Sequence, residues 1–178
     1  MRLSFGRLQI HGLLITVNNM EKVYFCLGSN VGNKRENMEK AMKMMEEEGV
    51  RITKMSKFYE TQPVEVVHQD WFVNAVAEAE TDLEPEKLLI MLKNIESKVG
   101  RKFTYRWGPR IVDVDILIYG DRIVDTSVLT IPHKLMDQRR FVLEPLAEIA
   151  PGLVHPVLKK TVKELLNECK DMAIVSPL

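Results

Sequence analysis

Two aspartates, Asp113 and Asp115, stand in a segment that otherwise has the composition of a buried strand. In GPRIVDVDILIYG, residues 108–120, they alternate with aliphatic residues. Asp is depleted in strands because it competes for backbone hydrogen bonds and gains nothing from apolar packing. Successive side chains of a strand point to opposite faces. One face is therefore expected to be apolar and covered by helices: Val112, Val114, Ile116 and Ile118. The other face is expected to hold the two carboxylates: Ile111, Asp113, Asp115, Leu117 and Tyr119.

The spacing of these carboxylates suits a metal site. Residues two apart on one face of a strand have attachment points roughly 6.5 to 7 Å apart, so the carboxylates can converge on metal ions about 3.5 to 4 Å apart. Oxygen-only ligands favour Mg²⁺, which binds through one or two carboxylates together with water and substrate phosphates. The alternative is an edge strand whose solvent-facing side happens to be acidic.

A cluster of cations directly precedes the two aspartates. Between Ser97 and Val112 the chain has no acidic residue and these cations: Lys98, Arg101, Lys102, Arg106 and Arg110. A basic loop is often only solvated, but beside paired carboxylates it indicates a site for Mg²⁺ and polyphosphate, because arginine matches phosphate geometry bidentately. The chain has no GxxxxGK[ST] or GxGxxG loop, so side chains and metals would hold a nucleotide here.

The elements that must position these residues follow from hydrophobic periodicity. The pattern predicts strands over 22–28, 50–61 and 71–81, the last with Phe72, Asn74, Val76 and Glu78 on one face. It predicts one helix with the stripe Met38, Ala41, Met42 and Met45, ended by Gly49. A second helix begins near Pro85, has the stripe Leu88, Leu89, Met91, Leu92, Ile95 and Val99, and ends at Gly100.

The rest of the chain is less regular. Residues 101–110 have no period and predict a loop, and Gly120-Asp121 fits a hairpin turn after the aspartate strand. A short helical piece is expected near Glu144 to Ile149, and a final helix with the stripe Val162, Leu165, Leu166 and Cys169. This order predicts an α+β fold with a ferredoxin-like core, in which helices pack a mainly antiparallel sheet in three layers, α-β-α.

Length and composition limit the possible functions. At 178 residues the chain is expected to form one domain over residues 20–178, with residues 1–19 as an N-terminal extension ahead of Met20. The formal net charge is zero, so no global field attracts nucleic acid or an anionic membrane. Cys26 and Cys169 lack metal spacing and are expected to be reduced. No apolar run is long enough to span a bilayer, and we expect a cytoplasmic protein.

Longer motifs resemble one enzyme family. LGSNVGN, YETQPV, DWFVNAV, RWGPRIVDVDILIYGD and LTIPHKLMDQRRFVLEPLAEIAP occur in this order, and they resemble the 6-hydroxymethyl-7,8-dihydropterin pyrophosphokinases of folate biosynthesis over about residues 21–168. The resemblance implies transfer of pyrophosphate from ATP to the hydroxymethyl group of the pterin, which gives the pterin diphosphate and AMP. It also implies two Mg²⁺ ions and, as the default, a monomer.

The resemblance also implies roles for individual residues. Asp113 and Asp115 would bind the two Mg²⁺ ions, and Arg101 and Arg110 would handle phosphate as catalytic residues. The implied ATP-binding residues are Glu96, Arg101, Trp107, Arg110, Ile116, Thr130, His133 and Arg139. The implied pterin-binding residues are Thr61, Val64, Phe72, Asn74 and Phe141. Phe72 and Phe141 would stack on the pterin, and Asn74 would bind its polar edge.

Several of these residues also allow a plainer interpretation. Glu96 can be a charge on the helix surface, His133 a surface or N-cap histidine, and Phe72 with Asn74 a core residue beside a satisfied polar group. The chain departs from the family pattern in RKFTYRW, residues 101–107, which is one residue shorter, and in Lys134, where tyrosine is common. Lys102 or Arg106 can substitute for the arginine missing from that loop.

Three other functions compete with this interpretation. Another Mg²⁺-dependent transferase with an Asp-x-Asp site would bind ATP without selecting a pterin. A ferredoxin-like RNA-binding module requires a basic domain and RNP-type aromatic residues, and the sequence has neither. A degenerate homologue would be expected to lose Asp113, Asp115 or His133, and all three are present.

Overall fold

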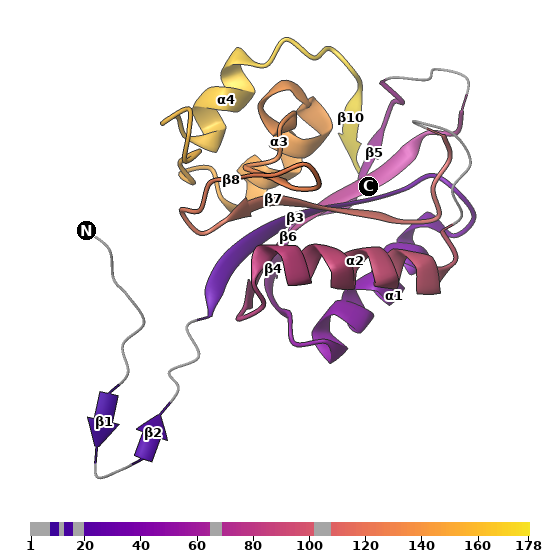
Figure 1. The fold of residues 1–178 in the computed structure, drawn as a ribbon. Coiled ribbons are helices and arrows are strands. Elements are labelled where there is room, and N and C mark those ends of the chain that lie inside the picture. The colour runs from indigo at the N-terminus through magenta and orange to yellow at the C-terminus, as the bar shows by residue number, and fades with distance from the viewer. Residues whose placement is uncertain (1–7, 11–12, 16–19, 65–68, 102–107) are drawn as a thin grey trace.

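The computed structural model describes residues 8–10, 13–15, 20–64, 69–101 and 108–178. Within these ranges the centre of the molecule is a six-stranded sheet (Figure 1). Its strands are β3 (Glu21–Ser29), β4 (Arg51–Met55), β5 (Tyr59–Thr61), β6 (Phe72–Thr81), β7 (Asp113–Tyr119) and β10 (Val175–Pro177). The order is β10-β5-β6-β3-β7, β4 also pairs with β6, and every pairing is antiparallel. The aspartate strand β7 therefore lies at one edge.

Helices cover both faces of this sheet. Figure 1 shows α1 (Lys34–Glu47) and α2 (Pro85–Val99) on one face, and α3 (Arg140–Ile149) and α4 (Val162–Glu168) on the other. The sequence β3-α1-β4-β6-α2-β7 is the ferredoxin-like core, so the predicted three-layer α+β fold is confirmed. The smaller elements are β1 (Leu8–Ile10), β2 (Leu13–Ile15), β8 (Val124–Asp125), β9 (Thr130–Ile131) and the 3₁₀ helix η1 (Met136–Gln138).

Each face of the sheet has its own hydrophobic core. On the side of α1 and α2, the core includes the predicted helix residues Met38, Ala41, Met45, Leu88, Leu92 and Ile95. On the side of α3 and α4, it includes Cys26, Val76, Leu143, Leu146, Val162 and Leu165. The predicted stripes of α1, α2 and α4 are therefore confirmed. Gly100 ends α2 with a φ of 115°, a conformation that favours glycine.

A β-bulge in β7 changes the predicted alternation. Tyr24 pairs with Ile118 but Phe25 pairs with Ile116, so Leu117 is an extra residue in β7. Before the bulge, the prediction is confirmed: Val112, Val114 and Ile116 lie in the core beneath α1 and α2. After it, the prediction is wrong, because Ile118 joins Leu117 in the other core and Tyr119 moves beneath α1 and α2.

Three further predictions of secondary structure are wrong. The single strand over 50–61 is two strands, β4 and β5, because the regular pairing with β6 is interrupted over residues 56–58, although Ser56 still bonds to Val76. The segment after Gly120 does not return along β7; its strand β8 pairs with β9 instead. The tail contains a strand that was not expected, β10, which pairs with β5. In addition, α3 begins at Arg140, ahead of the predicted start at Glu144.

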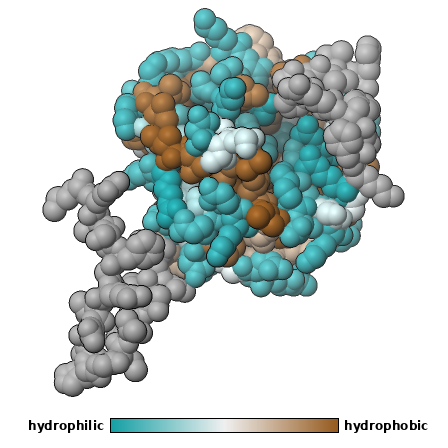
Figure 2. All heavy atoms as spheres, viewed as in Figure 1, coloured by the Kyte–Doolittle hydropathy of each residue, from teal (hydrophilic) through white to brown (hydrophobic). Residues whose placement is uncertain are grey.

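The surface of the described residues is mixed. Apolar side chains form a band in Figure 2 over the region of α4 and β8, surrounded by polar residues. Exposed apolar residues in the chain next to these elements are Ile123 and Val128, on either side of β8, and Val154, Val157 and Leu158, ahead of α4. No helix in the described ranges is long and apolar enough to cross a membrane. Cys26 and Cys169 are both free thiols, as expected.

Candidate active site

A pocket opens where β3, β5, β6 and β7 approach the start of α3. Its lining residues are Cys26, Gly28, Thr61, Gln62, Pro63, Val64, Gln69, Phe72, Asn74, Arg110, Asp113, Asp115, Arg139 and Phe141. This set contains every residue predicted to bind the pterin and both predicted metal ligands. The pocket therefore has a charged end, at β7, and an aromatic and amide end, at β5, β6 and α3.

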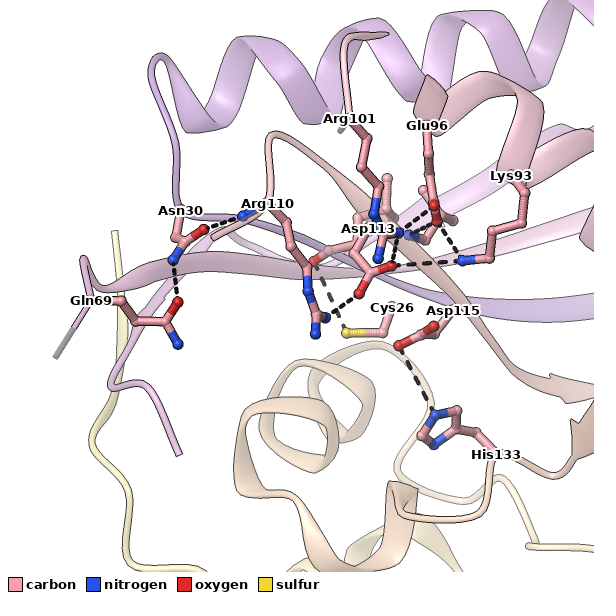
Figure 3. A network of polar contacts seen from close by, with 12 residues as sticks. Cys26, Asn30, Gln69, Lys93, Glu96, Arg101, Arg110, Asp113, Asp115 and His133 are labelled. Carbon is pink, nitrogen blue, oxygen red and sulfur yellow. Dashed lines mark hydrogen bonds and ion pairs between the residues drawn. The ribbon is translucent and has the colours of Figure 1, made fainter. Parts of the chain in front are cut away.

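Asp113 lies at the centre of the charged end. Its two carboxylate oxygens accept hydrogen bonds from Arg101 and Arg110 (Figure 3), and Lys93 Nζ lies 3.6 Å from its Oδ1. Burial opposes the charged form of this carboxyl, but the three cations outweigh burial and lower its pKa. Asp113 is therefore a carboxylate at neutral pH.

Asp115 lies beside Asp113 on the same face of β7, without a close arginine of its own. Burial, followed by the negative charge of Asp113, raises its pKa to about 6. The nearest ionisable partner is His133, whose Nε2 is 4.0 Å from Asp115 Oδ2. The two aspartates thus differ: nearby cations outweigh burial at Asp113, whereas burial and the charge of Asp113 outweigh the cations Lys93, Arg139 and Arg110 at Asp115.

His133 presents one defined ring nitrogen to Asp115. The backbone N–H of Leu135 donates to His133 Nδ1 at 3.2 Å, so the neutral ring must carry its proton on Nε2. Burial and then the positive charge of Arg139 lower the pKa of His133 to about 4. At neutral pH this residue is a neutral hydrogen-bond donor that points toward the charged end of the pocket (Figure 3).

Glu96 connects α2 to this end of the site. Its side chain is only 2% exposed, so it is not a charge on the helix surface. It accepts hydrogen bonds from Lys93 at 2.7 Å, from Arg101, and from the backbone N–H of Val114 at 2.9 Å. Burial raises its pKa, against the effect of Lys93. Glu96 thereby holds the open edge of β7 and shares Arg101 with Asp113.

The amide of Asn74 occupies the other end. Its Nδ2 donates to Thr61 Oγ1 at 2.6 Å, and both residues are buried. A Cβ on Gly28 would lie 2.5 Å from Asn74 Oδ1, closer than real atoms approach, so a glycine here makes room for the amide. Phe72 and Phe141 line the pocket from β6 and α3, and the Arg139 guanidinium lies 5.6 Å from the centre of the Phe141 ring.

Asn30 links two segments of the pocket lining by hydrogen bonds. Its side chain accepts a hydrogen bond from the Arg110 backbone N–H at 2.7 Å and donates to Gln69 Oε1 at 3.1 Å. It is 1% exposed. The loop after β3 thus holds the segment that carries Arg110 and the segment that leads into β6 (Figure 3).

Sequence reasoning gave no role to Asn30, Lys93 or Cys26. Asn30 lies within LGSNVGN, and Lys93 precedes Glu96 by three residues, a spacing that brings side chains together on a helix; these were the available signals. Cys26 is buried in the core on the side of α3 and α4, and it also lines the pocket. Burial and then the charge of Asp115 raise the pKa of its thiol far above the usual value, which keeps it protonated.

Of the predicted ATP-binding residues, Arg110 and Arg139 line the described pocket. Arg101 and His133 lie outside the lining but contact Asp113 and Asp115, and Glu96 is joined to them through Arg101. The other three have different places. Ile116 packs its side chain in the core beneath α1 and α2, which leaves only its main chain for a ligand. Thr130 lies in β9, next to the segment that leads to His133. Trp107, together with Lys102 and Arg106, lies outside the described residues.

The donor set at the charged end fits Mg²⁺ rather than a transition metal. No cluster of three or more His, Cys, Asp and Glu side chains occurs within the described ranges. Asp113 and Asp115 instead line the pocket from one strand, and their carboxylate oxygens would suit Mg²⁺, which completes such a donor set with water and phosphate oxygens.

Comparisons with known proteins agree with this geometry. A family model described as 7,8-dihydro-6-hydroxymethylpterin-pyrophosphokinase (HPPK) matches residues 24–151. A 2-amino-4-hydroxy-6-hydroxymethyldihydropteridine pyrophosphokinase of Aquifex aeolicus is 41% identical over 149 residues, which are 84% of this chain and 92% of the relative. A protein of the same name from Methylorubrum extorquens is 40% identical, over 83% of this chain and 92% of the relative.

Other relatives are much longer than this chain. The folic acid synthesis protein fol1 of Schizosaccharomyces pombe is 39% identical over 85% of this chain, which spans 21% of that protein. Among solved structures, wild-type HPPK-DHPS of Plasmodium falciparum matches with a TM-score of 0.67 at 15% identity, over 84% of this chain and 45% of that one. At this identity the structural match supports the fold alone.

Proposed function

The chain belongs to the 7,8-dihydro-6-hydroxymethylpterin-pyrophosphokinase family, and from this membership we propose the reaction that it catalyses. It is a pterin pyrophosphokinase of folate biosynthesis. The proposed reaction transfers the β,γ-pyrophosphoryl group of ATP to 6-hydroxymethyl-7,8-dihydropterin in the presence of Mg²⁺. The hydroxymethyl oxygen forms a bond to the β-phosphorus, the bond from that phosphorus to the α,β-bridging oxygen breaks, AMP leaves with that oxygen, and the hydroxyl proton is released.

One observation carries this proposal: a single pocket is lined by two carboxylates and arginines and also by an amide and two aromatic residues. A pterin is a flat heterocycle with hydrogen-bonding edges. Phe72 and Phe141 suit its faces, and the Asn74 amide suits its polar edge. The hydroxymethyl group would then point toward β7, where the phosphates must bind.

Asp113 and Asp115 are the residues that would hold Mg²⁺. When bound, the metal supplies neutralisation of the charge that develops on the phosphate oxygens. We propose two ions, because each aspartate differs in its partners and both face the pocket. Arg110, which contacts Asp113 in this structure, lies close enough to the same phosphates to contribute charge of the same sign.

Arg101, His133 and Arg139 complete the proposed phosphate site. Arg101 follows α2 and is held by Glu96 and Asp113. His133 offers its Nε2–H as a neutral donor, and Arg139 adds a permanent charge beside it. Positioning and electrostatic stabilisation by such groups account for most of the rate in phosphoryl transfer.

The open edge of β7 is the proposed contact for the nucleotide base. Val114 directs its backbone N–H outward to Glu96, and residues two apart in a strand direct their backbone groups the same way. Ile116 therefore presents its N–H and C=O to the same edge, before the bulge. This assigns to its main chain the role that its buried side chain cannot have.

The test is an AMP-release assay with ATP and Mg²⁺, with and without 6-hydroxymethyl-7,8-dihydropterin. We expect AMP only when both pterin and Mg²⁺ are present, in a one-to-one ratio with the pterin diphosphate. Formation of ADP would contradict pyrophosphoryl transfer and favour single-phosphoryl transfer by an Asp-x-Asp site. We expect this activity from a monomer, as the resemblance to the family implies, which light scattering at the assay concentration can check.

A further inference from the structure

The C-terminal tail joins the two walls of the pocket that enclose the aromatic and amide end. One wall is the start of α3, which carries Arg139 and Phe141; the other is the segment from Thr61 to Val64. The tail, residues 169–178, contacts both walls. It lies outside the residues 24–151 that match the family model, so family membership does not account for it.

At the first wall, Asp171 caps α3 from the tail. The N-cap residue Arg139 makes no side-chain cap, and the first turn of α3 has no acidic residue. Instead, the backbone N–H of Arg140 donates to Asp171 Oδ2 at 2.9 Å, across 31 residues of sequence. This bond satisfies one of the N–H groups that a helix start leaves open, and it places a negative charge at the positive end of the helix dipole.

A second set of hydrogen bonds joins the same two segments, the start of α3 and the tail, and here the side chain of Arg140 donates to the backbone of the tail. Its Nε donates to the backbone oxygen of Asp171 at 2.8 Å, and its Nη2 donates to the backbone oxygen of Cys169 at 3.4 Å. Arg140 therefore holds the tail, and the tail holds the backbone of Arg140. The neighbours of Arg140 on either side, Arg139 and Phe141, both line the pocket.

At the second wall, the tail adds a strand to the edge of the sheet. In β10, Val175 pairs with Thr61, and the backbone N–H of Gln62 donates to the Ile174 oxygen at 3.0 Å. The backbone N–H of Leu178 donates to the Phe58 oxygen at 2.8 Å. Without β10, the short strand β5 would be an edge strand, and Thr61 would have hydrogen-bonded support from β6 alone.

We propose that Asp171 and Arg140 are positioning residues for the pterin, which act by seating the tail against both walls of its site. The nine residues after Cys169 hold both walls in position. One wall carries Phe141, and the other carries Thr61, the hydrogen-bond partner of Asn74. Loss of the anchor lets these walls move apart, while Asp113, Asp115 and the cations at the other end keep their contacts. This inference rests on the proposed function for the identity of the ligand.

The test compares Asp171→Ala with Met172→Ala in the full chain. Met172 is the adjacent tail residue and is 86% exposed, so its variant controls for a change within the tail. Binding of 6-hydroxymethyl-7,8-dihydropterin is measured with Mg²⁺ and a non-hydrolysable ATP analogue, and the KM values of ATP and pterin are measured separately. For Asp171→Ala we expect the pterin dissociation constant to rise about fivefold. The KM of ATP should rise less, because Arg139 lies on a wall that moves while Asp113, Asp115, Arg101 and Arg110 keep their contacts. Met172→Ala should match the unsubstituted chain.

Hydrogen exchange supplies a readout that does not require turnover. We expect faster exchange in Asp171→Ala at residues 58–62 and at the start of α3, with β3 and β7 unchanged. Arg140→Met, which keeps the apolar stem, should act in the same direction, and the double variant should lose less than the sum of the two because both residues hold one junction. If Asp171→Ala fails to fold, Arg140→Met, which removes the other half of the same junction, serves in its place with the same criterion.

Two outcomes would overturn the proposal. One is a pterin dissociation constant within twofold of the unsubstituted chain in a folded Asp171 variant. The other is an equal loss of ATP and pterin affinity with faster exchange throughout the sheet, because that is global destabilisation. An unsubstituted chain that binds no pterin would contradict the proposed function instead, and hydrogen exchange would still decide whether the tail holds the two walls.

Discussion

Asp113 and Asp115 are two residues apart on one strand, yet their surroundings drive their pKa values in opposite directions. Arg101, Arg110 and Lys93 lower the pKa of Asp113 against the effect of burial. Burial and the charge of Asp113 raise the pKa of Asp115 to about 6. A pair of carboxylates with divergent environments is typical of functional sites. At neutral pH the ionised form of Asp113 therefore stabilises the folded state, whereas the ionised form of Asp115 destabilises it.

Asp115→Asn is therefore expected to stabilise the protein while it abolishes turnover. A raised pKa in the folded state means that the ionised form costs stability at pH 7, above that pKa, and the cost fades as the pH falls through about 6. Removal of the charge should raise the free energy of unfolding by about 1 kcal/mol, after a discount for the exposure of the side chain. Turnover should fall by on the order of a thousandfold.

Asp113→Asn is the matched control for this prediction. It should lose turnover and also stability, because it leaves three nearby cations without their shared anion. Thermal unfolding in the presence of EDTA, together with AMP release, measures both variants. Equal effects of the two substitutions on stability would contradict the assignment of their environments.

Gly28→Ala should damage the pterin end of the site. The added Cβ would lie 2.5 Å from Asn74 Oδ1, so the amide must move away from Thr61. We expect the pterin KM to rise about tenfold or more, with a loss of about 1 to 3 kcal/mol in unfolding free energy from overpacking. Gly152→Ala is the control, because nothing lies within 4 Å of a Cβ at that position. Unchanged pterin kinetics in folded Gly28→Ala would show that the amide tolerates displacement.

At the residue scale, the sequence predicted those parts of the site that carry an unusual residue type. Two aspartates in a strand and a run of cations are visible without a structure. Asn30 is not, because its importance lies in backbone contacts with Arg110 and in a bond to Gln69, 39 residues away. The clustering of the pterin residues was implied by the resemblance, and no pattern of spacing could have placed Phe141 opposite Phe72.

At the scale of elements, Ser56 joins β4 to β5 across the bulge that separates them. Its hydroxyl accepts a hydrogen bond from the Val76 backbone N–H at 2.9 Å and donates to the Lys57 oxygen at 2.7 Å. Ser56→Ala leaves a buried N–H of β6 unsatisfied and should cost about 1 to 3 kcal/mol of unfolding free energy. Ser127→Ala, at an exposed position, should change it by less than about 0.5 kcal/mol. Chemical denaturation of both variants decides the comparison.

The elements that the sequence predicted well are those with an uninterrupted period. The stripes of α1 and α2 give their buried faces, and Gly49 and Gly100 give their ends. The prediction of a single strand over residues 50–61 was wrong because a bulge keeps the composition of a strand while it changes the pairing. Strand β10 was not predicted because three residues that include Pro177 are too few to show a hydrophobic period. They are extended because β5 offers them an open edge.

At the scale of the whole molecule, residues 20–178 are expected to fold and function without residues 1–19. Strands β1 and β2 pair only with each other in the described residues, and the family match begins at residue 24. A chain that starts at Met20 should keep its melting temperature within about 2 °C and its kcat within about twofold. A chain that starts at Tyr24 is the contrast: it loses Val23, which is fully buried, and should melt markedly lower. Equal melting of the two shortened chains would contradict this boundary.

Strand β7 contributes side chains to both hydrophobic cores, and the bulge at Leu117 decides which of its last residues join which core. Ile116 and Tyr119 pack beneath α1 and α2, whereas Leu117 and Ile118, between them in sequence, pack against the α3 and α4 layer. Neither layer can melt without pulling the same four residues out of the other. We therefore expect the protein to unfold in one cooperative step, with equal calorimetric and van't Hoff enthalpies. Two separable heat-absorption peaks would mean that the layers are independent folding units, although one strand serves them both.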